Sequence, residues 1–116
     1  MVQFNPFKDA KPVRFYRSEI GREPVRDWLR RLPRSDRKVI GRDILTLQLG
    51  WPLGMPLARK LEDGLWEIRS RLNTVNARII FTVRNDTIVL IHGFIKKTGK
   101  TPTRDLRVAR QRMERL

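Results

Sequence analysis

The chain has 116 residues with 26 Lys or Arg and 12 Asp or Glu, a formal net charge of +14, and its 40% hydrophobic content is enough for one folded domain. The absence of cysteine excludes a disulfide scaffold and a thiol nucleophile, and with a single histidine we expect no metal site and no cofactor. Apolar runs fall far short of the ~20 residues of a membrane helix, and no signal peptide opens the chain. We therefore expect a cytoplasmic protein without a membrane partner.

The basic excess is spread over the whole chain. Residues 1–58 carry 12 basic and 6 acidic side chains, and residues 59–116 carry 14 and 6. A basic field spread over a folded domain favours binding to nucleic acid or to the ribosome. The alternatives are an ordinary basic protein and a match to an acidic protein partner.

The N-terminal half predicts a strand followed by two helices. Residues 1–12 read as an irregular lead-in, and the alternation over 13–17 predicts a short strand. A first helix is expected over 24–32, ended by Pro33, and a second begins at a capping Ser35 and stops at Gly50. Their apolar faces comprise Val25, Trp28, Leu29, Leu32, Ile40, Ile44 and Leu47. Because the connecting turn is short, we expect the two helices to form an antiparallel hairpin.

From Leu57 onwards the apolar period changes to two. A short strand over 57–61 precedes a turn, and the segments 65–72, 77–83 and 87–95 predict a three-stranded antiparallel meander.

The C-terminal part predicts a basic loop and a last helix. Residues 96–100 form the loop, and Thr101 as a cap followed by Pro102 predicts a helix from there to the C-terminus. The helix has an apolar face and much arginine on its other faces: Leu106, Ala109, Met113 and Leu116 against Arg104, Arg107, Arg110, Arg112 and Arg115. The order β-α-α-β-β-β-α predicts an α+β domain, with two N-terminal helices packed on a small antiparallel sheet and one C-terminal helix.

Three motifs carry a resemblance to a known family. Residues 57–70 read LARKLEDGLWEIRS, residues 77–81 read ARIIF, and residues 92–98 read HGFIKKT. Together they resemble the phage-derived, HigB-like branch of the RelE/ParE toxins of type II toxin–antitoxin systems, over about residues 13–116. The resemblance implies a single RelE-like domain spanning 1–116.

The resemblance also implies an activity and partners. It implies a toxin that cleaves mRNA, usually on the ribosome, and so arrests translation and growth. It implies a cognate antitoxin, typically a helix-turn-helix protein, and contact with operator DNA only through the antitoxin complex. The ParE side of the superfamily instead inhibits DNA gyrase without catalysis, and a basic nucleic-acid-binding module is a further alternative. The fold alone does not choose among these functions.

RNA cleavage without a metal ion needs a base for the 2′-hydroxyl, cations for the phosphorane and an acid for the leaving 5′-oxygen. No carboxylate cluster in the sequence suggests a two-metal nuclease. Arg69 and Arg71 share the polar face of one expected strand and Arg78 lies on the next, so these guanidiniums can clamp a phosphate. The alternative is that they pair with Glu67 or are simply solvated. We expect truncation of Arg69 or Arg78 to leave the core intact.

Other candidates lie at the strand ends. His92 is the only histidine, and the unperturbed pKa of an imidazole suits a general acid or base, although His92 can equally be a packed histidine. Lys96, Lys97 and, with less specificity, Lys60 are candidate phosphate contacts. Several RelE-like nucleases use a tyrosine near the C-terminus, but the only tyrosine here is Tyr16. The candidate catalytic residues are therefore Arg69, Arg78 and His92, the candidate RNA-binding residues are Lys60, Arg71, Lys96 and Lys97, and the identity of the base stays open.

Overall fold

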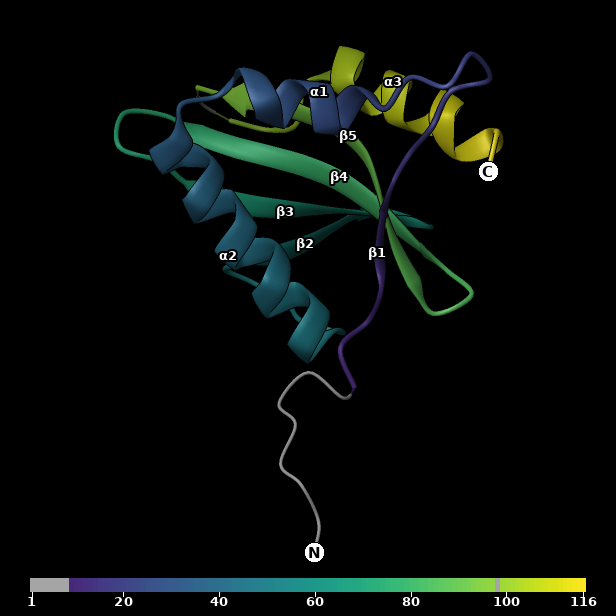
Figure 1. Ribbon diagram of the computed structural model, residues 1–116, viewed down its shortest axis with the longest axis horizontal. Coiled ribbons are helices and arrows are strands. Elements are labelled where there is room, and N and C mark those ends of the chain that lie inside the picture. The colour runs from purple at the N-terminus through teal and green to yellow at the C-terminus, as the bar shows by residue number, and fades with distance from the viewer. Residues whose placement is uncertain (1–8, 98) are drawn as a thin grey trace, which may run out of the picture.

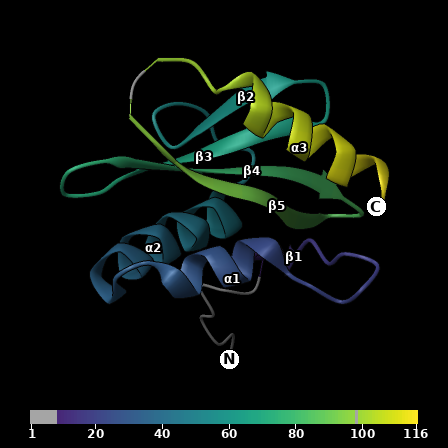
Figure 2. The same ribbon diagram turned by 90° about the horizontal axis from the view of Figure 1, so that it is seen from above.

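The computed structural model describes residues 9–97 and 99–116. Most of the expected lead-in (1–8) and Thr98 lie outside these residues. The elements in chain order are β1 (Val13–Phe15), α1 (Pro24–Arg31), α2 (Arg34–Gly50), β2 (Ala58–Glu62), β3 (Leu65–Arg71), β4 (Asn76–Arg84), β5 (Thr87–Lys96) and α3 (Thr103–Glu114). The α+β class is confirmed, and the elements form three layers with the sheet in the middle (Figures 1 and 2).

The sheet has five strands in the order β1-β5-β4-β3-β2. The expected meander is confirmed, because β3, β4 and β5 pair antiparallel in sequence order. The expected short strand over 57–61 is confirmed as β2, which extends the meander by pairing with β3; the order written from the sequence counted one strand too few. The expectation of a purely antiparallel sheet is wrong, since β1 pairs parallel with β5. After β1 the chain passes through both helices to the far edge of the sheet, and the meander then returns it to β1.

The helices lie on both faces of the sheet. Figure 2 shows α1 and α2 on one face and α3 on the other. The expected antiparallel helix hairpin is wrong: α1 packs on β5 and α2 packs on β3, and the two helices diverge from their common turn (Figure 1). Their apolar faces bury against the sheet, where Val25 and Ile40 are fully enclosed. A side chain at Gly93 would overlap the Trp28 ring, so this glycine lets α1 lie close to β5.

The expected helix starts also change. Pro33 is the residue before α2, so Ser35 lies inside the first turn and is not its cap. Pro102 takes the same position before α3, and the side chain of Thr101 makes no capping bond there. The Thr101 hydroxyl is thereby free to bond a residue of the sheet.

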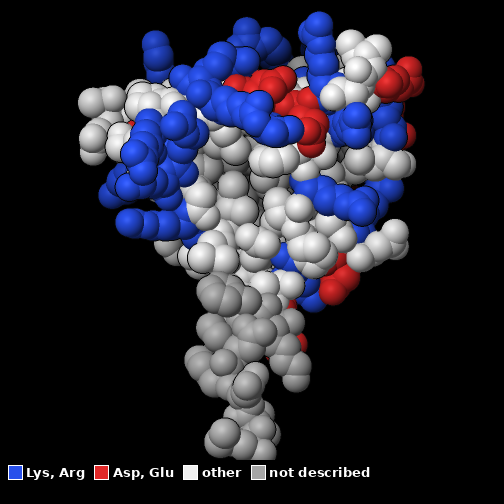
Figure 3. All heavy atoms as spheres, in the orientation of Figure 1, with Lys and Arg blue, Asp and Glu red and all other residues white. Residues whose placement is uncertain are grey.

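Two apolar cores lie on the two faces of the sheet. The larger one, under α1 and α2, includes Ile68, Ile79 and Phe81; the smaller one, under α3, includes Leu65 and Ile80. Within the described ranges, no helix is long and apolar enough to cross a membrane. Lys and Arg side chains are spread widely over the face seen in Figure 3, with few acidic ones among them.

Candidate functional site

The α3-facing side of the sheet carries a band of charged residues near the ends of β3 and β4. Strand pairing sets Arg69 opposite Arg78, and sets Glu67 opposite Arg59 on one side and Ile80 on the other. Because side chains alternate along a strand, these charged residues share one face. The sequence pattern thus places side chains from three strands together.

A buried ion pair lies at the centre of this band. Glu67 and Arg78 are only 1% and 5% exposed, and Arg78 Nε lies 3.6 Å from Glu67 Oε1. The Thr101 hydroxyl donates a 2.7 Å hydrogen bond to Glu67 Oε2. Glu67 Oε1 and Arg78 Nε have no hydrogen-bond partner in the part of the chain that the structure describes. These two atoms face each other at 3.6 Å, just beyond hydrogen-bond distance, and both are enclosed, so a ligand reaches them only when the ion pair opens.

Three further cations surround the pair. Burial lowers the pKa of Lys96, Glu67 partly offsets this, and the charges of Arg78, Arg69 and Arg59 lower it further. Burial also lowers the pKa of Arg78, again offset by Glu67 and reinforced by Arg69 and Arg59. We call Arg59, Arg69, Arg78 and Lys96, together with Glu67, the basic cluster. Four cations around one carboxylate repel one another, and a bound anion would relieve that repulsion.

An open groove of about 690 Å³ adjoins the basic cluster. Arg69, Arg71, Asn76 and Arg78 line it from the sheet. The Arg69 side chain is partly exposed and its guanidinium lies 3.1 Å from the Met55 sulfur. The cluster is therefore reachable from solvent, although its central ion pair is buried.

The predicted site residues separate into two groups. The structure brings Arg69, Arg78 and Lys96 together, with Arg71 exposed at the groove. Lys97 is exposed and lines a neighbouring hollow of about 480 Å³. Lys60 is separate from the basic cluster and from both hollows. Its ammonium lies 6.0 Å from the centre of the Trp66 ring, on the other face of the sheet, and 3.3 Å from Asp63.

Two residues of this site are not predicted from the sequence, and the role of a third is only partly predicted. No sequence pattern singles out Arg59, although β2 pairing places it directly opposite Glu67. The sequence predicts Thr101 only as a helix cap and Glu67 only as a partner for arginine. The burial of Arg78 also corrects the expectation that its truncation leaves the fold untouched.

His92 lies under α3 and outside the basic cluster. Its Nε2 is 2.7 Å from Asp105 Oδ1, and its Nδ1 is 3.4 Å from the Arg112 guanidinium. The register places Ile80 between His92 and Glu67. Burial lowers the pKa of His92, with Asp105 partly offsetting and Arg112 adding to the effect. Both ring nitrogens thus face groups of α3.

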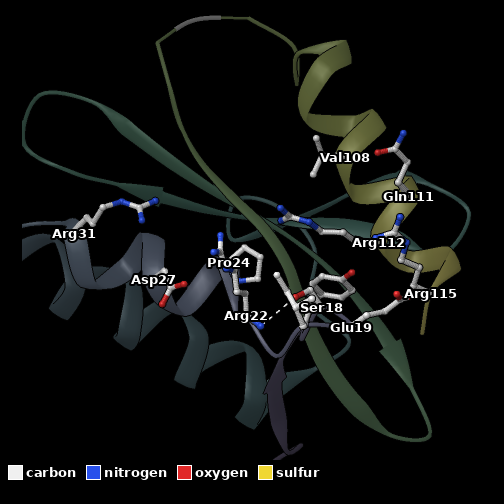
Figure 4. A pocket seen from close by; sticks show the side chains of 12 residues that line it. Ser18, Glu19, Arg22, Pro24, Asp27, Arg31, Val108, Gln111, Arg112 and Arg115 are labelled. Carbon is white, nitrogen blue, oxygen red and sulfur yellow. Dashed lines mark hydrogen bonds between the residues drawn. The ribbon is translucent and has the colours of Figure 1, made fainter.

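A second hollow, of about 700 Å³, lies between residues 16–24, α1 and α3 (Figure 4). Its lining mixes both signs of charge, with Glu19 and Asp27 among several arginines. It contains none of the predicted site residues, and no buried unpartnered atom of the described residues lies in it. The basic cluster and its groove are therefore the better candidate site. Among residues 9–97 and 99–116, no group of three or more His, Asp or Glu lies together as a candidate metal site.

Comparison with known proteins identifies a family for this chain. No curated protein matches the chain significantly. Residues 27–114, most of the chain, match the family described as phage-derived protein Gp49-like (DUF891). That family is associated with toxins of the RelE/ParE type, and a toxin of this kind has a cognate antitoxin as its partner. This chain belongs to the Gp49-like family of phage-derived proteins.

Proposed function

We propose that this protein is the toxin of a type II toxin–antitoxin pair and an endoribonuclease that cleaves mRNA on the ribosome with its own side chains. The observation that carries the proposal is the buried Glu67 carboxylate, whose Oε1 atom makes no hydrogen bond among the described residues and lies 3.6 Å from Arg78 Nε within a group of four cations. A base beside a phosphate-binding set of guanidiniums is what cleavage by the 2′-hydroxyl requires. Membership of a family associated with toxins supports the biological side.

In the proposed reaction, RNA binding opens the Glu67–Arg78 pair, and Glu67 Oε1 accepts the proton of a ribose 2′-hydroxyl. The 2′-oxygen then bonds the adjacent phosphorus while the bond from phosphorus to the 5′-oxygen breaks. The products are a 2′,3′-cyclic phosphate and a 5′-hydroxyl end. Arg69 and Arg78 stabilise the extra negative charge of the phosphorane. Lys96 donates a proton to the leaving 5′-oxygen, and burial favours this because it lowers the pKa of the ammonium.

The other predicted site residues do not take part in proton transfer or in phosphorane stabilisation. Arg71 and Lys97 are exposed beside the cluster and contact the RNA backbone as it enters and leaves. We assign His92 a positioning role, because its contacts with Asp105 and Arg112 hold α3 against the sheet. Lys60 has no part in the proposal, since it lies against Trp66 on the opposite face.

The proposal includes an antitoxin that neutralises the protein. A chain with a net charge of +14 is matched best by a partner with an acidic binding segment. We propose a helix-turn-helix antitoxin, with operator DNA bound by the complex and not by the toxin alone.

The test is induction of the protein in growing bacteria without its antitoxin, followed by pulse labelling and mapping of RNA ends. Wild type should stop protein synthesis before DNA synthesis and leave mRNA fragments with 5′-hydroxyl ends. Glu67→Gln should abolish both effects, whereas Glu114→Gln, an exposed change at the end of α3, should keep them. A thermal melt of each purified variant shows whether it is folded.

Two results would contradict the proposal. If DNA synthesis stops first while mRNA stays intact, the protein acts on DNA gyrase or a similar target. If cells that make soluble, folded wild type at a high level grow normally, the protein is not a toxin.

A further inference from the structure

The groove beside the basic cluster has a second wall that the cleavage reaction does not use. Figure 1 shows α2 running alongside the sheet, and Val39, Asp43 and Thr46 line the groove from this helix. Pro56, Leu57 and Ser70 complete the lining. Arg69 and Arg78 belong both to the groove and to the cluster, so the two are continuous. A volume of about 690 Å³ lies inside the range of about 300–1,000 Å³ typical of small-ligand sites.

The lining of the groove includes both apolar and cationic side chains. The side chains of Val39 and Leu57 are partly exposed and supply apolar contact. Arg69 and Arg71, whose side chains share the α3 side of the sheet, also line the groove, so it passes from one face to the other beyond the pairing of β2 with β3. Guanidinium groups stack well on flat aromatic rings. A flat heteroaromatic ring attached to a phosphate matches this combination, because the ring takes the groove and the phosphate takes the cluster.

Asp43 is the acidic residue of the groove. The buried hydroxyl of Ser70 donates a 2.6 Å hydrogen bond to Asp43 Oδ2, which fixes the orientation of the carboxylate. Within the described ranges, no ion pair and no other hydrogen bond reaches this side chain. A half-buried carboxylate held in place without a cation of its own still has lone pairs for donors on a ligand.

We propose that this groove binds the nucleobase next to the cleaved phosphate and that Asp43 selects guanine. The inference rests on the proposed RNA cleavage. Guanine carries two adjacent donors on its Watson–Crick edge, N1–H and the exocyclic 2-amino group, and a carboxylate accepts from both. Adenine and cytosine present one donor group beside an acceptor, and the uracil donor lies between two carbonyls that a carboxylate repels. A well-formed two-bond contact of this kind discriminates against the wrong base by about tenfold or more.

The experiment compares guanine with inosine, which lacks only the 2-amino group, at the position beside the cleavage site. Short synthetic mRNAs are presented to wild-type protein both free and on programmed ribosomes. Wild type should cleave the guanine RNA about tenfold faster than the inosine RNA. Asp43→Asn should cleave the two at nearly equal rates. Asp27→Asn, which makes the same change of charge on an exposed residue of α1 outside the groove, should keep the wild-type ratio.

Each cleavage result either supports or overturns guanine selection by Asp43. Equal cleavage of the guanine and inosine RNAs by wild type overturns the inference, and this comparison needs no variant to fold. A guanine preference that persists in Asp43→Asn also overturns it, while RNA cleavage itself stands. If wild type leaves every RNA intact, free or on the ribosome, the proposed function fails and the base site fails with it.

Discussion

Truncation of Arg69 and of Arg78 should give the same loss of cleavage but very different losses of stability. Arg78 is 5% exposed and pairs with the fully buried Glu67, whereas the Arg69 side chain is partly exposed. Arg78→Ala removes the ion-pair partner of a buried carboxylate, which costs about 3–5 kcal/mol of unfolding free energy. Arg69→Ala removes no such partner and should change it by about 0.5 kcal/mol.

These free energies convert into melting temperatures and rates. For a domain of this size, the Arg78→Ala variant should melt roughly 10–25 °C below wild type and the Arg69→Ala variant within about 3 °C of it. If both guanidiniums stabilise the phosphorane, each truncation costs about 2–4 kcal/mol of transition-state stabilisation, or about 10²–10³ in rate. Thermal melts and single-turnover cleavage at a temperature where every variant is folded measure the two effects separately.

The matched control is Arg84→Ala, an exposed arginine at the other end of β4, which should change neither quantity. If Arg78→Ala has the melting temperature of wild type, the ion pair with Glu67 contributes nothing to the free energy of unfolding and the burial argument is wrong. If Arg69→Ala cleaves RNA at the wild-type rate, the cluster does not stabilise the transition state.

Three further perturbations follow from single contacts. Thr101→Val removes the hydroxyl that bonds Glu67, so cleavage should slow about tenfold while Thr101→Ser keeps its rate; equal rates for both variants would exclude a positioning role. Burial lowers the pKa of His92 in the folded protein, so on acidification the unfolded chain binds the proton first. The stability that His92 contributes is therefore present above its ordinary pKa and is lost as the pH falls through the lower pKa of the folded state. The melting temperature should thus drop less on acidification in His92→Gln than in wild type, and parallel pH profiles would contradict this. Gly93→Ala forces a methyl group into the tryptophan ring of α1 and should cost about 1–3 kcal/mol in a thermal melt, while Gly41→Ala, which meets open space, should not destabilise the protein.

Local patterns in the sequence account for much of this molecule. The helical spacing of apolar residues and the period of two after Leu57 correspond to α1, α2 and the strands β2 to β5, because both periods depend only on neighbouring residues. The same alternation put Arg69 and Arg78 on one face of adjacent strands, as the pairing confirms. The three motifs pointed to toxins of the RelE/ParE type, with which the matched family is associated.

The membership of the site depended on contacts between segments far apart in the sequence. Arg59 and Lys60 are neighbours, yet the pairing of β2 with β3 turns Arg59 toward Glu67 and Lys60 toward Trp66. A shift of one residue in that register would exchange them, because successive side chains point to opposite faces. No local pattern sets this register.

Packing of α3 on the sheet decides the contacts of Glu67 and His92. It brings Thr101 to Glu67 and Asp105 to His92. His92, which the sequence predicts to act on RNA, therefore has a hydrogen-bond partner within the protein. Arg78 is likewise buried in a central strand, between Arg69 of β3 and Phe94 of β5, and no neighbouring residue in the sequence indicates this burial. The sequence alone determined which side chains could carry the chemistry, and the tertiary packing decided which of them meet, because burial and distance are properties of the whole fold.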